Sequence, residues 1–230
     1  SSLLQSQVLN QDLEDHLLAA ETPAWCETLA GQGLFPPGAG AELEQGILSD
    51  RLQALQQQLD RLGRCSRQGT LLMAGDIQVV VQPGRFTPRG LLRGWLQHLQ
   101  LCAESADFGG SAVIARADKG DEAKTHVRWG RLKPSEAQAQ LLSLQRLAQR
   151  GQHQCWPVPP RSGWLLMSKE HNKAGSGVAA FQDSWIRERQ EPQQRLCFGA
   201  EAEADQLLQS EGFEQACALL YTPLLQALVR

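Results

Sequence analysis

The sequence predicts an α/β fold in which a small mixed sheet is wrapped by helices, and two patterns predict it. Leucine-rich stretches with helical spacing fill most of the chain, and between them lie short segments with the β-branched residues and turns of β-hairpins. The length of 230 residues is enough for a large core. We expect one domain over residues 1–230, with a helical part at 1–65, a core containing the hairpins at 66–167 and a helical part at 179–230.

The first part of the chain is predicted to be helical. Residues 3–20 place apolar side chains on one broad face, and Thr22 followed by Pro23 caps a short second helix that ends near Gly31. The clearest helix spans residues 41–62. A narrow apolar seam runs along it and consists of Leu48, Leu52, Leu55, Leu59 and Leu62. We expect this helix to dock along a sheet or a helix layer, with a coiled coil as the alternative.

The first hairpin is predicted in the segment 70–87, which is rich in β-branched residues. Proline and glycine within residues 82–85 mark its turn, so the strands span 74–81 and 84–87. Thr87 and Pro88 then begin a helix. Its apolar face is formed by Leu92, Trp95, Leu96 and Leu99.

A second hairpin is predicted at 111–129, where two short strands flank a charged turn. The next helix runs from Pro134 to about Arg150 and ends at Gly151. Four of its side chains are expected to point inward, namely Leu141, Leu144, Leu147 and Ala148. The remaining segments are predicted as an extended stretch at 156–160, a short strand at 164–167, an exposed loop at 169–178 and helices at 179–190, 200–210 and 213–229.

Composition excludes several classes of protein. The net charge of −3 is unlike that of a free-standing DNA-binding protein, which needs a basic excess to neutralise phosphates. No apolar run reaches the roughly 18 residues that span a bilayer, so no membrane association is expected. The six cysteines are widely spaced, which argues against a metal cluster and is typical of thiols in a reducing cytoplasm. The absence of an initial methionine indicates a piece of a longer polypeptide.

A hairpin followed by a helix is also where one type of nuclease holds Mg²⁺ between carboxylates on neighbouring strands. Asp76 is the only acidic residue of the two predicted strands, and a hard cation needs at least two acidic groups. We therefore predict no catalytic residues, no metal site and no cofactor. The five histidines are scattered, and His98 is expected to be structural or surface-facing.

Arginines cluster around the first hairpin and the helix after it. If they converge, they form a modest phosphate-binding surface, and the candidates are Arg64, Arg67, Arg85, Arg89 and Arg93. Arg89 and Arg93 are four residues apart and share a helix face. The alternative is a solvated arginine face that pairs with nearby Asp and Glu.

Several segments in the same order resemble the C-terminal region of the exodeoxyribonuclease V gamma subunit, RecC. The resemblance is carried by Leu91–Cys102 (LLRGWLQHLQLC), the helix at 41–62, the hairpin at 75–84, the helix at 134–150, Ser162-Gly163-Trp164 in a proline-rich strand, and Leu219–Leu224 (LLYTPL). It covers residues 3–229, apart from the loop at 168–178. It implies a restriction-endonuclease-like fold that has lost its metal ligands; the aspartate of active relatives falls near Gln78.

The resemblance also implies a function. The chain is then a C-terminal, non-catalytic domain that guides DNA and supports duplex strand separation and subunit assembly in double-strand-break repair by recombination. Its partners are RecB, RecD and a forked or duplex DNA end, in the cytoplasm. The hairpins at 71–87 and 112–129 are both candidates for the strand-splitting element. The alternatives are an active Mg²⁺-dependent nuclease and an unrelated helical interaction module.

Overall fold

The structure is a computed structural model, and it describes residues 27, 31, 35, 38–117, 119–120, 122–153, 158–172 and 175–229. The predicted helix at 3–20 lies outside the described residues, and so does nearly all of the short helix after it. The chain divides into two compact units, each built from two separate stretches. We call residues 1–86 and 107–128 the sheet unit, and residues 87–106 and 129–230 the helical unit.

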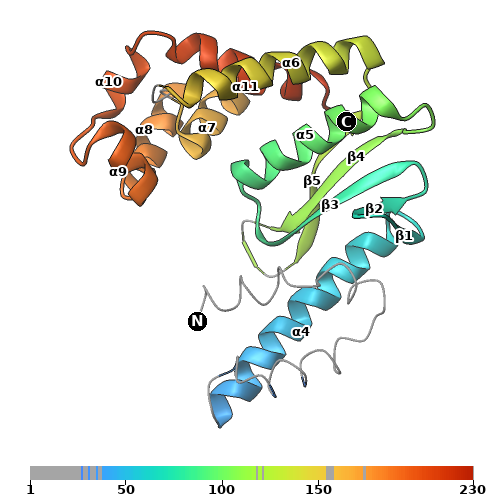
Figure 1. Cartoon of the computed structure of the whole chain (residues 1–230). Coiled ribbons are helices and arrows are strands. Elements are labelled where there is room, and N and C mark those ends of the chain that lie inside the picture. Colours follow the sequence, from blue (N-terminus) through green and yellow to red (C-terminus); the bar gives the residue numbers. More distant parts are fainter. Residues whose placement is uncertain are drawn as a thin grey trace. The chain divides into compact units, whose positions relative to one another are not determined.

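The sheet unit contains a long helix and a mixed sheet, which confirms the predicted α/β class (Figure 1). Its elements are α4 (Ala39–Asp60), β1 (Cys65–Gln68), β2 (Leu71–Ala74), β3 (Ile77–Arg85), β4 (Gly110–Arg116) and β5 (Ala123–Gly130), of which the last two residues fall in the helical unit. The strands lie in the order β1-β2-β3-β4-β5. Strand β2 pairs antiparallel with both β1 and β3, whereas β3 and β4 pair parallel.

The leucine seam of α4 packs on the sheet. This is one of the two kinds of docking that the sequence analysis expected, on a sheet or on a helix layer. Leu48, Leu52, Leu55 and Leu59 are all buried in one cluster with strand residues. The strand side of this cluster consists of Leu72, Ala74, Val79 and Ile114. Gln58 also donates a hydrogen bond to the Thr125 hydroxyl at 2.9 Å, which ties α4 to β5. The narrow seam is therefore the contact of a helix with a sheet.

The predicted turn of the first hairpin is wrong. The chain reverses at Gly75-Asp76, where Gly75 has a φ of +65°, and β3 continues through Pro83 and Gly84 to Arg85. Extending the β2–β3 register places Leu71, the first residue of β2, beside Val80. Pro83 thus lies where β3 has run past β2, and its missing N–H costs no hydrogen bond on that side. On the β4 side, an irregularity between Gln82 and Arg85 accommodates the proline.

The helical unit is built mainly from helices, and the sequence analysis predicted the positions of some of them. Their bounds are α5 (Pro88–Glu104), α6 (Pro134–Gly151), α7 (Pro160–His171), α8 (Gly177–Glu188), α9 (Pro192–Phe198), α10 (Ala204–Leu208) and α11 (Phe213–Gln226). The predicted start of α5 is confirmed, because the Thr87 hydroxyl accepts a hydrogen bond from the Gly90 N–H at 3.2 Å. The second hairpin, formed by β4 and β5, is also where the sequence predicted it.

The strand predicted at 164–167 is wrong, because these residues lie inside α7. Pro160 occupies the first turn of this helix, where proline is tolerated. The buried carboxylate of Glu188, on α8, accepts hydrogen bonds from the Arg161 N–H at 2.9 Å and the Ser162 N–H at 2.7 Å. The cap that starts α7 thus comes from a distant part of the sequence. The loop predicted at 169–178 is correspondingly shortened, since α7 extends to His171 and α8 begins at Gly177.

An aromatic cluster around His98 forms part of the core of the helical unit. The His98 ring stacks on Trp95 with a centroid distance of 5.2 Å and lies 5.5 Å from the ring of Trp129. Its Nε2 atom lies 3.5 Å from the Cys102 sulfur. Burial lowers the pKa of His98 to about 4, although a hydrogen bond with the Gly130 backbone partly opposes this shift. The sequence analysis expected His98 to be either structural or surface-facing, and it is a structural residue of the core.

The buried His98 predicts an acid-sensitive core. The unfolded chain binds a proton near pH 6.5 while the folded chain does so only near pH 4, so stability falls as pH drops between these values. The loss should reach about 3 kcal/mol at pH 4. Urea unfolding of the wild type and of His98→Gln from pH 7 to pH 4 measures it. The wild type should lose more stability than the variant, and equal losses would contradict the prediction.

Candidate functional site

The strands that would carry a nuclease site are β2 and β3, and neither has an acidic side chain. Asp76 lies in the turn between them and is exposed. Its backbone carbonyl accepts a hydrogen bond from the Gly109 N–H at 2.9 Å, so the residue helps to fix the entry into β4. The observed strand boundaries therefore place Asp76 in the turn between β2 and β3 and not within a strand, where the sequence analysis had put it.

Gln78 occupies the position where the resemblance places the aspartate of active relatives. Its side chain is buried, and its amide oxygen accepts a hydrogen bond from the Ser111 hydroxyl at 2.9 Å. This contact joins β3 to β4 with neutral groups. Within the described parts of the chain, no group of three or more His, Cys, Asp or Glu side chains is arranged to hold a metal ion.

The candidate arginines of the sheet unit do not converge. Arg64 and Arg67 are exposed at the β1 edge, and the Arg67 Nε donates a hydrogen bond to the Gly69 carbonyl at 3.0 Å. Arg67 of β1 pairs with Leu72 of β2, and extending the β2–β3 register places Leu72 opposite Val79 of β3. Arg85 lies roughly 20 Å further along that strand, at the rise of a β-strand per residue.

Arg85 instead lies beside Arg116, which the sequence analysis missed. The two residues are register partners at the ends of the parallel strands β3 and β4. Next to them, the rings of Phe86 and His126 stack with centroids 4.7 Å apart and an interplanar angle of 8°. His126 also makes a hydrogen bond of 3.0 Å with the Arg116 carbonyl. We call Arg85, Phe86, Arg116 and His126 the strand-end cluster.

Only the pairing of strands could have identified this cluster. Arg116 ends a strand that the sequence predicted, but nothing local shows that β4 runs parallel to β3 with these ends adjacent. A parallel pair requires a crossover connection, which is here α5. The cluster combines an exposed arginine, a half-buried arginine and an aromatic stack, which are groups suited to phosphate and base contacts.

Arg89 and Arg93 belong to the helical unit and are exposed on α5. Arg89 forms an ion pair with Glu191 at 2.9 Å, which is the acidic pairing that the sequence analysis gave as the alternative. Such an exposed pair contributes about 0–1 kcal/mol to stability. The charge of Arg89 is therefore partly compensated within its own unit, whereas no described residue forms an ion pair with Arg93.

Comparison with known proteins gives one family. A search among curated proteins finds no match, and no described helix has the length and apolar character needed to cross a bilayer. The model of the family described as the RecC C-terminal domain matches residues 1–171, which is most of the chain. This stretch contains α4, the described strands β1 to β5, and helices α5 to α7. The chain therefore belongs to the RecC C-terminal domain family.

Proposed function

We propose that this chain is a non-catalytic domain of the exodeoxyribonuclease V gamma subunit that guides DNA strands and supports subunit assembly in the cytoplasm. The observation that carries the proposal is the family match over residues 1–171. Family membership implies that the domain acts within the RecBCD complex, whose other subunits are RecB and RecD. Its role there is in strand separation during double-strand-break repair by recombination.

The lack of catalysis is supported by the residues of the β2–β3 hairpin. This hairpin leads into α5, as the resemblance to a restriction-endonuclease-like fold requires. At the position of the expected aspartate, Gln78 is neutral and is engaged by Ser111. A buried amide in a hydrogen bond with a hydroxyl has no charge to attract Mg²⁺. In this proposal the domain keeps the architecture of a nuclease and uses it for contact with DNA.

The contact with DNA is supported by the strand-end cluster. Arg85 is exposed, Arg116 lies beside it, and the Phe86–His126 stack is half-buried next to them. Arginine contacts phosphates through charge, and aromatic rings stack on splayed bases. Because the sequence as a whole has a charge of −3, this contact is local, and the rest of the complex holds the DNA end in place.

Charge reversal at Arg85 tests the proposal. The gamma subunit with Arg85→Glu should still assemble with RecB and RecD, but the complex should bind a forked duplex several-fold more weakly. The slope of log affinity against log salt should fall by about one, as for the loss of one phosphate contact. Binding titrations at several salt concentrations measure both effects.

Arg61→Glu is the matched control, because Arg61 is also an exposed arginine of the sheet unit but follows α4 and donates to Gln58. It should leave DNA binding unchanged. Wild-type binding by the Arg85→Glu complex would refute the DNA contact. Mg²⁺-dependent DNA cleavage by the purified chain, abolished by Asp76→Ala, would refute the non-catalytic assignment.

A further inference from the structure

The Phe86–His126 stack of the strand-end cluster is held in a fixed orientation. Phe86 directly follows β3 and His126 belongs to β5, with β4 between these strands in the sheet. The two rings nevertheless stack, with centroids 4.7 Å apart and planes that differ by only 8°. The Nε2 atom of His126 lies 3.0 Å from the Arg116 carbonyl. Because a carbonyl oxygen only accepts hydrogen bonds, Nε2 carries the proton and this bond fixes the imidazole ring.

Two exposed arginines of the sheet unit flank this stack. Arg85 directly precedes Phe86. Arg128 lies two positions after His126 on β5, which places both on one face of the strand, about 7 Å apart along it. No described residue forms an ion pair with either Arg85 or Arg128. Arg116, in contrast, is half-buried and has other contacts within the protein, so its clearest part here is to hold His126 through its carbonyl.

Acidic residues near the cluster limit where a phosphate can bind. The sequence of the segment that joins β4 to β5 contains Asp118, Asp121 and Glu122. Carboxylates in this segment repel a phosphate that approaches it. Arg128 lies further along β5, away from this segment. A bound DNA strand is therefore expected to pass from Arg85 over the stack towards Arg128.

We propose that the strand-end cluster binds an unpaired nucleotide of single-stranded DNA. Its base stacks on the Phe86–His126 pair, and the phosphates on either side contact Arg85 and Arg128. A base inside a duplex has a neighbouring base pair on each face, so an unpaired base is the one that can stack on a protein ring. A duplex backbone is the poorer ligand, because it presents a dense row of phosphates to only two exposed arginines. The inference rests on the proposed function and deepens it by naming the ligand of this cluster.

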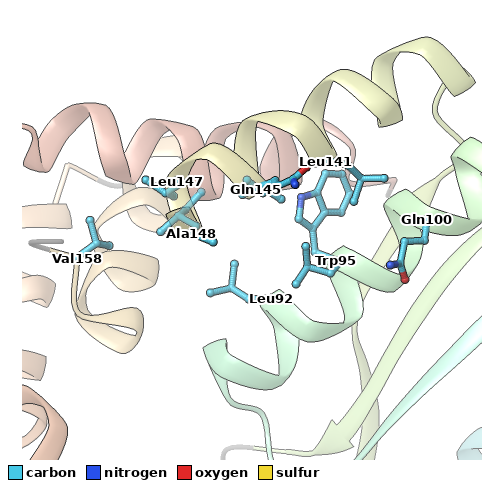
Figure 2. Close-up of a pocket in the computed structure, with 11 residues that line it drawn as sticks. Leu92, Trp95, Gln100, Leu141, Gln145, Leu147, Ala148 and Val158 are labelled. Atoms are coloured by element: carbon cyan, nitrogen blue, oxygen red, sulfur yellow. The ribbon is translucent and has the colours of Figure 1, made fainter. Parts of the chain in front are cut away.

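The apolar groove of the helical unit offers DNA no comparable site. It lies between α5 and α6, encloses about 670 Å³ and has no charged residue in its lining. Figure 2 shows Leu92 facing Ala148 across the space, and Trp95 lying near Leu141. Of the whole length of α6, only Ala137 is buried. The leucines of α6 that were expected to point inward are half-buried in the lining of this groove, namely Leu141, Leu144 and Leu147.

Forked DNA with and without bases in its unpaired tails tests the stacking. Phe86→Leu keeps an apolar side chain but removes the ring. In the RecBCD complex it should weaken the binding of a fork with natural tails by about fivefold or more, the usual cost of losing one base–aromatic contact. Binding of a fork with abasic tails, which keep the phosphates, should not change. The slope of log affinity against log salt should stay that of the wild type. Titrations of both forks at several salt concentrations measure these effects.

Two further variants separate stacking from folding and from charge. His126→Gln keeps an N–H donor for the Arg116 carbonyl but has no ring, so it should reproduce the pattern of Phe86→Leu. Arg128→Glu should weaken the binding of both forks and lower the salt slope by about one. The matched control is Phe198→Leu, because Phe198 is also a half-buried phenylalanine but packs on Trp185 in the helical unit. It should bind both forks as the wild type does.

Three results would each overturn the proposal. They are wild-type binding of the natural fork by both Phe86→Leu and His126→Gln, equal losses on the natural and the abasic fork, and loss of RecB or RecD from the complex of both variants. The last result would identify the stack as a subunit contact or a folding element. If Arg85→Glu impairs DNA binding while Phe86→Leu and His126→Gln bind both forks normally, the nucleotide inference fails and the proposed function stands.

Discussion

Replacing Trp129 by alanine should reduce the free energy of unfolding by about 3–5 kcal/mol, the usual cost of truncating a buried tryptophan. The side chain is 1% exposed and packs against Trp95, with ring centroids 5.2 Å apart. Its indole N–H donates a hydrogen bond to the Leu224 carbonyl at 3.2 Å. Alanine would leave both a cavity and an unsatisfied carbonyl at the end of α11. Urea unfolding followed by circular dichroism would measure the loss.

Trp129→Phe separates the two contributions. Phenylalanine keeps an aromatic ring beside Trp95 but cannot donate to Leu224, so we expect a smaller loss than for alanine. Truncation of an exposed side chain such as Leu196, which is 88% exposed, should change stability by about 0.5 kcal/mol or less. A loss in Trp129→Ala as small as that in Leu196→Ala would show that Trp129 is not a core residue.

Glu188→Ala should be nearly as damaging, with a loss of about 2–5 kcal/mol. The carboxylate is 2% exposed and accepts hydrogen bonds from the N–H groups of Arg161 and Ser162 and from the Ser162 hydroxyl. These N–H groups belong to the first turn of α7, which has no internal partner for them. Alanine would leave buried donors without an acceptor, and the start of α7 should fray. Thermal and urea unfolding at neutral pH would measure the loss.

Two comparisons make this prediction specific. Glu188→Gln keeps one acceptor oxygen and should lose less stability than alanine. Glu191→Ala removes a nearby carboxylate that is paired with Arg89 at the surface, so its cost should be about 1 kcal/mol or less. If Glu188→Ala and Glu191→Ala had the same unfolding midpoint, the cap assigned to Glu188 would be excluded.

The elements that the sequence predicted correctly are those whose signals are local. Thr87 and Pro88 indicate the start of α5. The Thr87 hydroxyl can cap a helix and the fixed φ of Pro88 suits the first helical position, whatever the rest of the fold. The seam of α4 is equally local, since its spacing alone defines an apolar stripe. By contrast, the strand wrongly predicted at 164–167 is a helix because Glu188, far along the chain, supplies the acceptors that the proline-rich entry lacks.

The same distinction explains what was missed at the candidate sites. Pro83-Gly84 has the composition of a turn, but β2 is too short to reach it, and strand length depends on pairing. Likewise, the adjacency of Arg85 and Arg116 follows from a parallel register, which no short motif encodes. The leucines of α6 were correctly recognised as one face, yet periodicity does not reveal whether that face is covered.

The arrangement of the chain between its units has a consequence for cooperativity. The neighbouring strands β3 and β4 are connected in the chain by α5, and this helix belongs to the helical unit. When the helical unit unfolds, α5 becomes a flexible loop between the two strands. Closing that loop adds an entropic cost to the parallel pairing of β3 and β4. Damage at Glu188, which lies outside the strands, should therefore also weaken the sheet through the chain connection, so that the two units lose their order together.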